Sequence, residues 1–146
     1  MRVINAENMV LGRLASIIAK ELINNIKTYK NEEFAVVNVE KAIIIGRKED
    51  ILKKYKRLSE EIGSDRKGPY LPRRPDRLFR RTVRGMLPYQ KSQGRMALKK
   101  MKAYVGIPKE FEGYELEVFK EAEYGGHRRH IELGRLCQYL KSDLKL

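Results

Sequence analysis

Arginine is concentrated in one stretch of the chain, residues 73–88, which read RRPDRLFRRTVRGMLP. Six of these sixteen residues are arginine, none is lysine, and Asp76 is the one acid among them. A planar guanidinium group can give a phosphate two parallel hydrogen bonds and can stack on a base, whereas the lysine ammonium acts as a point charge. The preference for arginine therefore indicates phosphate contacts rather than a general need for solubility.

Helical spacing sorts this stretch into two faces. At about 100° per residue, four arginines share one arc: Arg77, Arg80, Arg81 and Arg84. Phe79, Val83 and Met86 fall on the opposite side and are expected to anchor the helix to a core. Like charges three and four residues apart destabilise an isolated helix, and solvated helix faces usually interleave both signs. The pattern therefore favours a helix that binds phosphates over a merely solvated face.

The excess of positive charge lies in the middle of the chain. The 146 residues carry a formal net charge of +13. Residues 66–109 hold 14 basic side chains and one acid, while residues 1–65 and 110–146 are nearly balanced, at +2 and −2. Such a distribution predicts a polyanionic partner, either a nucleic acid or an acidic membrane.

Two basic helices and a basic loop would make a broad surface rather than a pocket. A broad surface suits a folded RNA, recognised through its phosphates, shape and 2′-hydroxyls, better than a helix that reads bases in a DNA major groove. Besides the four arginines of the helix, the side chains predicted to contact RNA are Arg66, Lys67, Arg73, Arg74, Lys91, Arg95, Lys99 and Lys100.

The first part of the chain is typical of an α/β core. The apolar run at 2–6 suits a strand, residues 11–26 carry apolar side chains at helical spacing, and residues 33–40 resemble a strand buried on both faces. Strand, helix and strand in about forty residues predict a βαβ unit with parallel strands. A second apolar run at 42–46 follows too closely for a parallel crossover. It is either a bent continuation of the strand or a tight hairpin.

Proline and glycine mark a boundary at 63–75, where an extended loop is expected. The loop separates a helix at 48–62 from the arginine helix at 76–87. A fourth, basic helix then leads to a core strand at 102–106. Beyond that strand the pattern weakens, although residues 133–140 are again helix-like.

These elements predict one α/β domain with a small, mostly parallel sheet and a basic extension of helices and loop. Its parts are a core half at 1–62, a basic loop and helices that close on a core strand at 63–109, and a C-terminal tail at 110–146, within which YELEVF alternates like a strand.

Cysteine usage and hydropathy narrow the cellular context. Cys137 is the only cysteine, which excludes an internal disulfide and suits a reducing compartment. The N-terminus lacks the apolar segment of a secretory signal, and no apolar run approaches the ~20 residues of a membrane span. We therefore expect a cytosolic protein without a membrane partner.

Two glycine turns are weaker candidates for phosphate contacts. Gly12 opens a helix after a strand, but NMVLGRLAS contains neither G-x-G-x-x-G nor a Walker A motif. A tight strand-to-helix turn is the favoured interpretation, although the helix start could hold one RNA phosphate beside Arg13. Gly46, followed by Arg47 and Lys48, presents the same two alternatives.

Metal binding and catalysis are not expected. His127, His130 and Cys137 offer three candidate ligands, whereas structural zinc normally takes four. No Ser/His/Asp set or carboxylate pair is arranged recognisably for catalysis. We therefore predict no metal, no cofactor and no small-molecule substrate.

Three segments resemble a known family. RRTVRGMLPYQKSQGRMALKKMKAYVGIP at 80–108 is similar to the signature of the large-subunit ribosomal protein thirteen family. VINAENMVLGRLASIIAK at 3–20 resembles its N-terminal strand and GRLAS helix, and VVNVEKAIIIGRK at 36–48 resembles its second strand and following turn. The match is collinear over about residues 1–108, and the form of the basic segment is closer to archaeal or eukaryotic members than to bacterial ones.

The resemblance implies a three-layer α/β/α fold and a structural role in the cytoplasmic ribosome. The implied partners are large-subunit rRNA and neighbouring large-subunit proteins. Nothing is carried over to residues 110–146, which vary within such families. Two alternatives remain: a nucleotide-dependent enzyme on a Rossmann-like core, and a membrane-surface protein using residues 76–102, which lack the Trp/Leu-rich face of such anchors.

Overall fold

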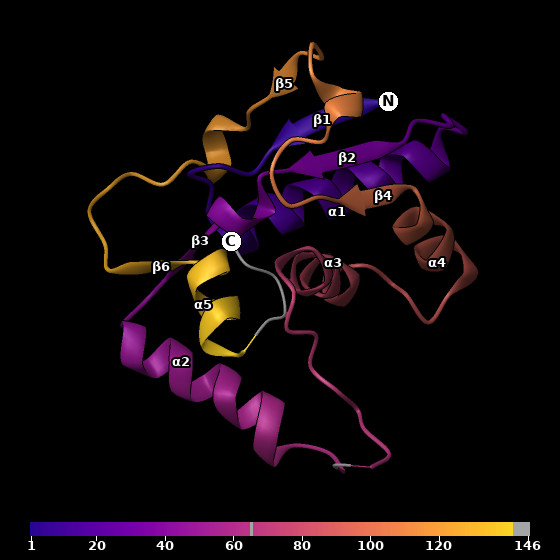
Figure 1. The fold of residues 1–146 in the computed structure, drawn as a ribbon. Helices are drawn as coiled ribbons and strands as arrows, with labels where there is room; N and C mark the ends of the chain where they lie inside the picture. The colour runs from indigo at the N-terminus through magenta and orange to yellow at the C-terminus, as the bar shows by residue number, and fades with distance from the viewer. Residues whose placement is uncertain (65, 142–146) are drawn as a thin grey trace.

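A four-stranded parallel sheet organises the fold (Figure 1). The computed structural model describes residues 1–64 and 66–141. The strands lie in the order β4-β2-β1-β5, and every neighbouring pair is parallel. Their bounds are β1 Arg2–Asn5, β2 Phe34–Val37, β4 Met101–Ala103 and β5 Leu116–Glu117. The predicted α/β class, with its parallel βαβ unit, is confirmed.

Helices and a small second sheet surround these strands. The α-helices of the described residues are α1 Leu11–Lys27, α2 Lys48–Lys56, α3 Pro75–Met86, α4 Ser92–Lys99 and α5 Leu133–Tyr139. Short helical turns are η1 Val39–Lys41, η2 Arg57–Glu61, which is π-helical and continues α2, η3 Lys109–Phe111 and η4 Lys120–Ala122. Strands β3 Ile43–Ile45 and β6 His130–Glu132 form the second sheet.

Side chains of the main sheet alternate between two packed layers, as the two-residue period of a strand requires. Ile4 and Val36 point into the main core, which they share with apolar side chains of the helices. Val3 and Val37 point the other way and pack with Phe111 of η3. Both faces of the sheet are therefore covered, which explains the continuous apolar runs of its strands.

The apolar run at 42–46 is neither a continuation of β2 nor a hairpin with it, so both alternatives considered from the sequence are wrong. Turn η1 redirects the chain after β2, and it is entered through Asn38 in a left-handed conformation with φ at 55°. Strand β3 then leaves the main sheet and pairs antiparallel with β6, where Ile44 lies opposite Ile131. The partner strand lies far along the chain, so local periodicity could not reveal it.

An ion-pair cluster holds the edge strand β5 in place. Arg2 of β1 donates hydrogen bonds of 2.7–3.2 Å to the carboxylate of Glu117 and one of 2.8 Å to Glu21 of α1. The hydrogen bonds from Arg2 lower the pKa of Glu117, although burial opposes this shift. One arginine thus joins β1, β5 and α1.

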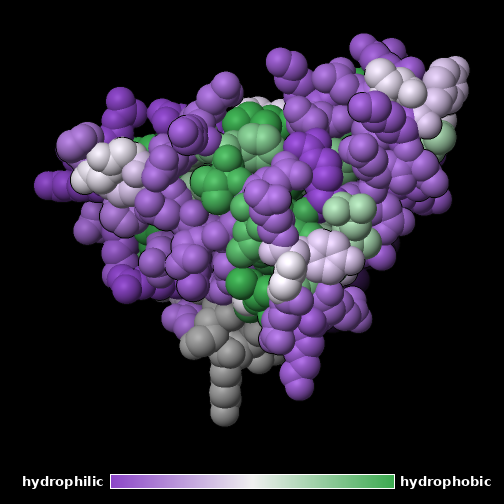
Figure 2. Space-filling view, turned by 90° about the horizontal axis from the view of Figure 1, so that it is seen from above, coloured by the Kyte–Doolittle hydropathy of each residue, from purple (hydrophilic) through white to green (hydrophobic). Residues whose placement is uncertain are grey.

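Exposed apolar side chains gather on one face of the molecule. Seen from above the view of Figure 1, hydrophobic side chains form a central band that hydrophilic ones surround (Figure 2). The segment after β4 contributes Ile107, Tyr114 and Val118 to the exposed apolar surface of the protein.

Gly94 of α4 lies against the turn that follows α3. A β-carbon at Gly94 would come within 2.2 Å of the carbonyl oxygen of Pro88 and 2.8 Å of the backbone nitrogen of Tyr89. Backbone atoms cannot rotate aside as a flexible side chain can, so a larger residue must displace α4. At Gly85, on the exposed side of α3, a β-carbon would meet no described atom within 4 Å.

The two glycines should therefore respond in opposite ways to alanine. We expect Gly94→Ala to lower the free energy of unfolding by roughly 1–3 kcal/mol, the usual cost of overpacking. Gly85→Ala should raise it by about 0.4–1 kcal/mol, because alanine loses less backbone entropy in a helix. Urea unfolding followed by circular dichroism measures both. If both variants changed the free energy of unfolding by the same amount and in the same direction, the close packing of α4 against the turn after α3 would be contradicted.

Candidate nucleic-acid interface

Helix α3 presents arginines on one side and core side chains on the other, as its spacing predicts. Phe79 and Val83 are fully buried, and Leu78 is 2% exposed. The predicted burial of Met86 is wrong, since this side chain is 42% exposed. Met86 is the last residue of α3, and Leu87, just beyond the helix, is buried in the core instead.

The four arginines of α3 are exposed, and none has an acidic partner among the described residues. In the part of the chain that the structure describes, no carboxylate forms an ion pair with any of them. Asp76, the only acid of the basic segment, instead accepts a 3.2 Å hydrogen bond from Arg74. The positive charge of this helix face is therefore left for an external anion.

A groove runs along the arginine face. It has a volume of about 420 Å³. Its lining residues, which we call the arginine groove, are Pro69, Tyr70, Pro72, Arg77, Arg80, Arg81, Arg84 and Leu98. The proline-rich loop forms one side, α3 supplies the arginines, and a long 3.5 Å hydrogen bond from Arg80 to the Leu98 carbonyl links α3 to α4.

Two tyrosines beside the arginines were not predicted. Tyr70 is 65% exposed and lines the arginine groove. Tyr89 is 42% exposed, and the guanidinium carbon of Arg84 lies 5.0 Å from its ring centroid. Exposed aromatic rings within a basic surface can stack unpaired bases. The signal in the sequence was the placement of each tyrosine directly after a proline in a basic segment.

Most other predicted contact residues are exposed near α4 or in the loop. Arg66 and Lys67 lie in the loop before α3, whose exposed residues also include Arg74. On or beside α4, Lys91, Arg95 and Lys99 are exposed, and Lys100 is half-buried. Among these, Lys100 donates a hydrogen bond to Asn31, and the others project into solvent.

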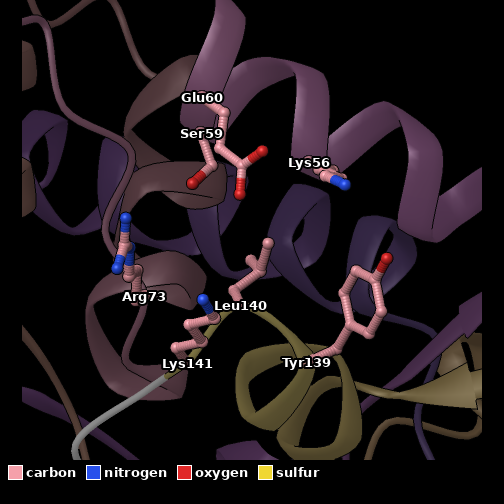
Figure 3. A pocket seen from close by; sticks show the side chains of 7 residues that line it. All are labelled: Lys56, Ser59, Glu60, Arg73, Tyr139, Leu140 and Lys141. Carbon is pink, nitrogen blue, oxygen red and sulfur yellow. The ribbon is translucent and has the colours of Figure 1, made fainter. Parts of the chain in front are cut away.

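Arg73 lies apart from the arginine groove. It lines a separate pocket of about 280 Å³ between the α2–η2 helix and α5, together with Lys56, Glu60 and Lys141 (Figure 3). The pocket mixes three basic groups with one carboxylate, so its charge is partly compensated. The structure therefore separates Arg73 from the arginines of α3 that are close to it in sequence.

Arg13, Arg47 and Lys48 also lie away from the arginine groove, at the starts of α1 and α2. Gly12 lies inside α1, and the strand-to-helix turn before it contains Asn8 in a left-handed conformation with φ at 57°. Gly12 thus opens a helix just after a strand and a tight turn, as the favoured interpretation of this segment expects.

The histidines and the cysteine do not converge. His127 and His130 are exposed, whereas Cys137 is buried in the core. No group of three or more candidate metal ligands occurs among the described residues. Burial, with a smaller contribution from Asp76, raises the pKa of the Cys137 thiol to about 12. A thiol with such a pKa is protonated and unreactive at neutral pH.

The charge of the molecular surface changes sign after β4. Residues 110–123 hold six glutamates and one lysine. A phosphate backbone is repelled by such a segment and attracted by the arginine groove and α4. The arrangement therefore directs a polyanion toward the arginine groove and α4 and away from residues 110–123.

Comparison with known proteins identifies the family of this chain. A family model described as ribosomal protein L13 matches residues 1–110. The chain is 43% identical to large ribosomal subunit protein uL13 of Methanosarcina barkeri over 144 residues, covering 97% of this chain and 99% of the relative. Proteins of the same name from Methanopyrus kandleri and Methanosphaera stadtmanae are 44% and 45% identical, over 94% of this chain and 85% and 95% of their own lengths. The match to the family model over most of the chain and the near-full-length similarity to these archaeal relatives show that the chain belongs to the ribosomal protein L13 family.

Proposed function

We propose that this protein is a structural constituent of the large ribosomal subunit and binds folded large-subunit rRNA. The contact surface is the arginine groove together with the exposed basic residues of α4 and of the loop before α3. Neighbouring large-subunit proteins are its further partners, and the ribosome of the cytoplasm is its location. The binding role requires neither a cofactor nor a small-molecule substrate.

One observation carries the proposal: a single groove is lined by four exposed arginines for which the described residues supply no acidic partner. Arginine pairs with phosphate through two parallel hydrogen bonds, and each such contact releases counterions from the nucleic acid. A core that buries Phe79 and Val83 holds these like charges side by side despite their mutual repulsion. Binding of an anion to the arginine face of α3 would neutralise these charges and remove their repulsion.

The shape of the surface favours folded RNA over duplex DNA. The arginine helix is anchored along one side and flanked by the loop and α4, so it does not project as a helix that enters a major groove does. Tyr70 and Tyr89 add exposed rings on which unpaired bases can stack. Unpaired, splayed bases are common in folded RNA and absent from regular duplex DNA.

The alternatives weighed from the sequence receive less support. The family is one of ribosomal proteins and not of enzymes, and the turn before α1 is formed by Asn8 without a glycine-rich phosphate loop. Addition of nucleotide should leave the melting temperature unchanged. The membrane-surface alternative is weakened by residues 76–102 themselves, which lack the Trp/Leu-rich face of such anchors.

Sedimentation tests the proposed function directly. We expect the protein in native lysate to migrate with the large subunit on a sucrose gradient and to remain there after a moderate-salt wash. The purified protein should also bind deproteinised large-subunit rRNA in preference to duplex DNA of equal length. Protein that stays at the top of the gradient, together with equal affinity for the two nucleic acids, would contradict the proposal.

A further inference from the structure

A second basic cluster lies where three distant segments meet. The backbone N–H of Ile43 donates to the carbonyl of Met9 at 2.8 Å, which places β3 beside the start of α1. At the other end of β3, the N–H of Gly46 donates to the carbonyl of Arg129 at 2.8 Å. The antiparallel pairing of β3 with β6 thus brings the loop before β6 to the starts of α1 and α2.

Tyr124 fixes the conformation of this loop. Its hydroxyl accepts a 3.2 Å hydrogen bond from the N–H of Arg128 and donates one to the carbonyl of the same residue. The N–H of Tyr124 donates to the carbonyl of Asn8 at 3.0 Å, and its ring centroid lies 4.5 Å from that of His130. The loop is therefore held against the turn before α1, and Arg128 is presented from a defined backbone.

A small cleft opens between the loop and α1. Its volume is about 160 Å³, and its polar lining includes Arg13, Tyr124, His127 and Arg128. Pockets for whole small-molecule ligands usually measure ~300–1,000 Å³. This cleft is smaller, so it suits a single compact group such as a backbone phosphate.

The described residues supply no acidic partner to the arginines that line the cleft or to the two on the backbone beside it. Among the described residues, no carboxylate forms an ion pair with Arg13, Arg47, Arg128 or Arg129. Glu123 and Glu132 line a separate pocket on the other side of the loop, and Glu132 is paired with Arg135 at 3.5 Å. The loop that carries Arg128 and Arg129 is therefore a positive site within residues 110–146, whose net charge is negative.

The cluster and the arginine groove belong to opposite ends of α1. Arg13 lies in the first turn of this helix. Helix α4, whose Leu98 lines the groove, lies toward the other end, because Lys100, just after α4, donates a hydrogen bond to Asn31, beyond the end of α1. A helix of 17 residues is about 25 Å long, so the two sites cannot share one phosphate group. Figure 1 shows the loop before β6 and helix α4 on opposite sides of the molecule.

We infer that Arg13 and Arg128, which line the cleft, form a second RNA-binding site with Arg47 and Arg129 on the adjoining backbone. This site holds the phosphate backbone of a different rRNA segment from the one in the arginine groove. The protein then joins two RNA segments across the length of α1. This inference rests on the proposed function, since it assumes that the partner is RNA. It assigns the loop at 124–130 a binding role that the sequence did not suggest.

Tethered cleavage can map the RNA beside each site. Ser16→Cys lies one turn after Arg13, and Ser92→Cys begins α4 beside Lys91; both positions are exposed. Cys137 is buried with a raised pKa, so an iron chelate attaches to the introduced thiols. Each labelled protein is bound to deproteinised large-subunit rRNA, and hydroxyl radicals released at the iron cut the nearby RNA.

We expect iron at position 16 and iron at position 92 to cut different rRNA segments. Adding Arg13→Gln and Arg128→Gln should abolish the cuts from position 16 and leave those from position 92 intact. The slope of log K against log salt should also flatten by about one to two, because up to two phosphate contacts are lost. The matched control, Lys20→Gln with Lys27→Gln, removes the same charge from exposed positions of α1 and should preserve both patterns.

Each other outcome is decisive. Cuts from position 92 without cuts from position 16, or position-16 cuts that survive the arginine double variant, would overturn the second site and leave the proposed function standing. Cuts at one shared segment would overturn the joining of two segments. Absence of binding and of cuts from either position would overturn the proposed function as well.

Discussion

Replacing Arg77, Arg80 and Arg84 together by glutamine is expected to flatten the slope of log K against log salt by about two to three. Each phosphate contact that a protein makes contributes roughly 0.7–0.9 to this slope through counterion release. The three side chains are exposed, share the arginine groove and lack acidic partners among the described residues. Filter binding to large-subunit rRNA at several salt concentrations measures the slope.

The same triple variant should fold normally. Glutamine keeps the side-chain length approximately and has a helix propensity close to that of arginine. The variant loses the long Arg80–Leu98 hydrogen bond and the contact of Arg84 with Tyr89, both at the surface. It also relieves repulsion between like charges one turn apart. These effects oppose each other, so the melting temperature should change little. Unfolding of the variant would show that the arginines support the core.

Lys27, Lys53 and Lys56 provide the matched control. All three are exposed, and they lie on α1 and α2, outside the arginine groove. Changing them to glutamine removes the same total charge from the protein. We expect the slope to stay close to that of the unmodified protein. Equal flattening by both triples would mean that net charge alone governs binding and that the assigned surface is wrong.

Local periodicity explains which parts of the fold could be predicted. The burial of Phe79 and Val83 follows from their spacing within one helix, because a helix with a single apolar face has one way to pack. The parallel pairing of β1 with β2 follows from the helix between them and from their continuous apolar runs. The prediction of Met86 failed at a helix end, where the chain leaves the helical path and Leu87 takes the buried position.

Long-range pairing explains what could not be predicted. The three-residue strand β3 carries no sign in its own sequence that its partner is β6. Because that pairing was missed, the position of Arg13 and Arg128 around one cleft was missed too. Arg73 shows the reverse case: its position beside the other arginines in the sequence suggested a shared surface, but the loop turns it toward a pocket near α5. Nearness along the chain predicts a shared surface only within one regular element.

Phe79→Ala should produce the largest loss of stability that a single side chain of α3 can cause. Phe79 is fully buried in the main core and is among the largest side chains there. Truncating such a residue removes its transfer free energy and leaves a cavity, at a typical cost of ~3–5 kcal/mol. Urea unfolding gives the difference in the free energy of unfolding. At temperatures where the variant remains folded, its salt slope for rRNA should be unchanged, because no charge has been removed.

Met86→Ala on the same helix is the control that tests the orientation of α3. Met86 is 42% exposed, so its truncation should cost less than about 1 kcal/mol. The contrast between the two variants depends on how the helix is rotated about its axis, and the same rotation determines where the four arginines point. If Met86→Ala costs as much as Phe79→Ala, α3 is turned relative to the core. The same rotation would turn the arginines away from the groove, and the assigned RNA surface would be wrong.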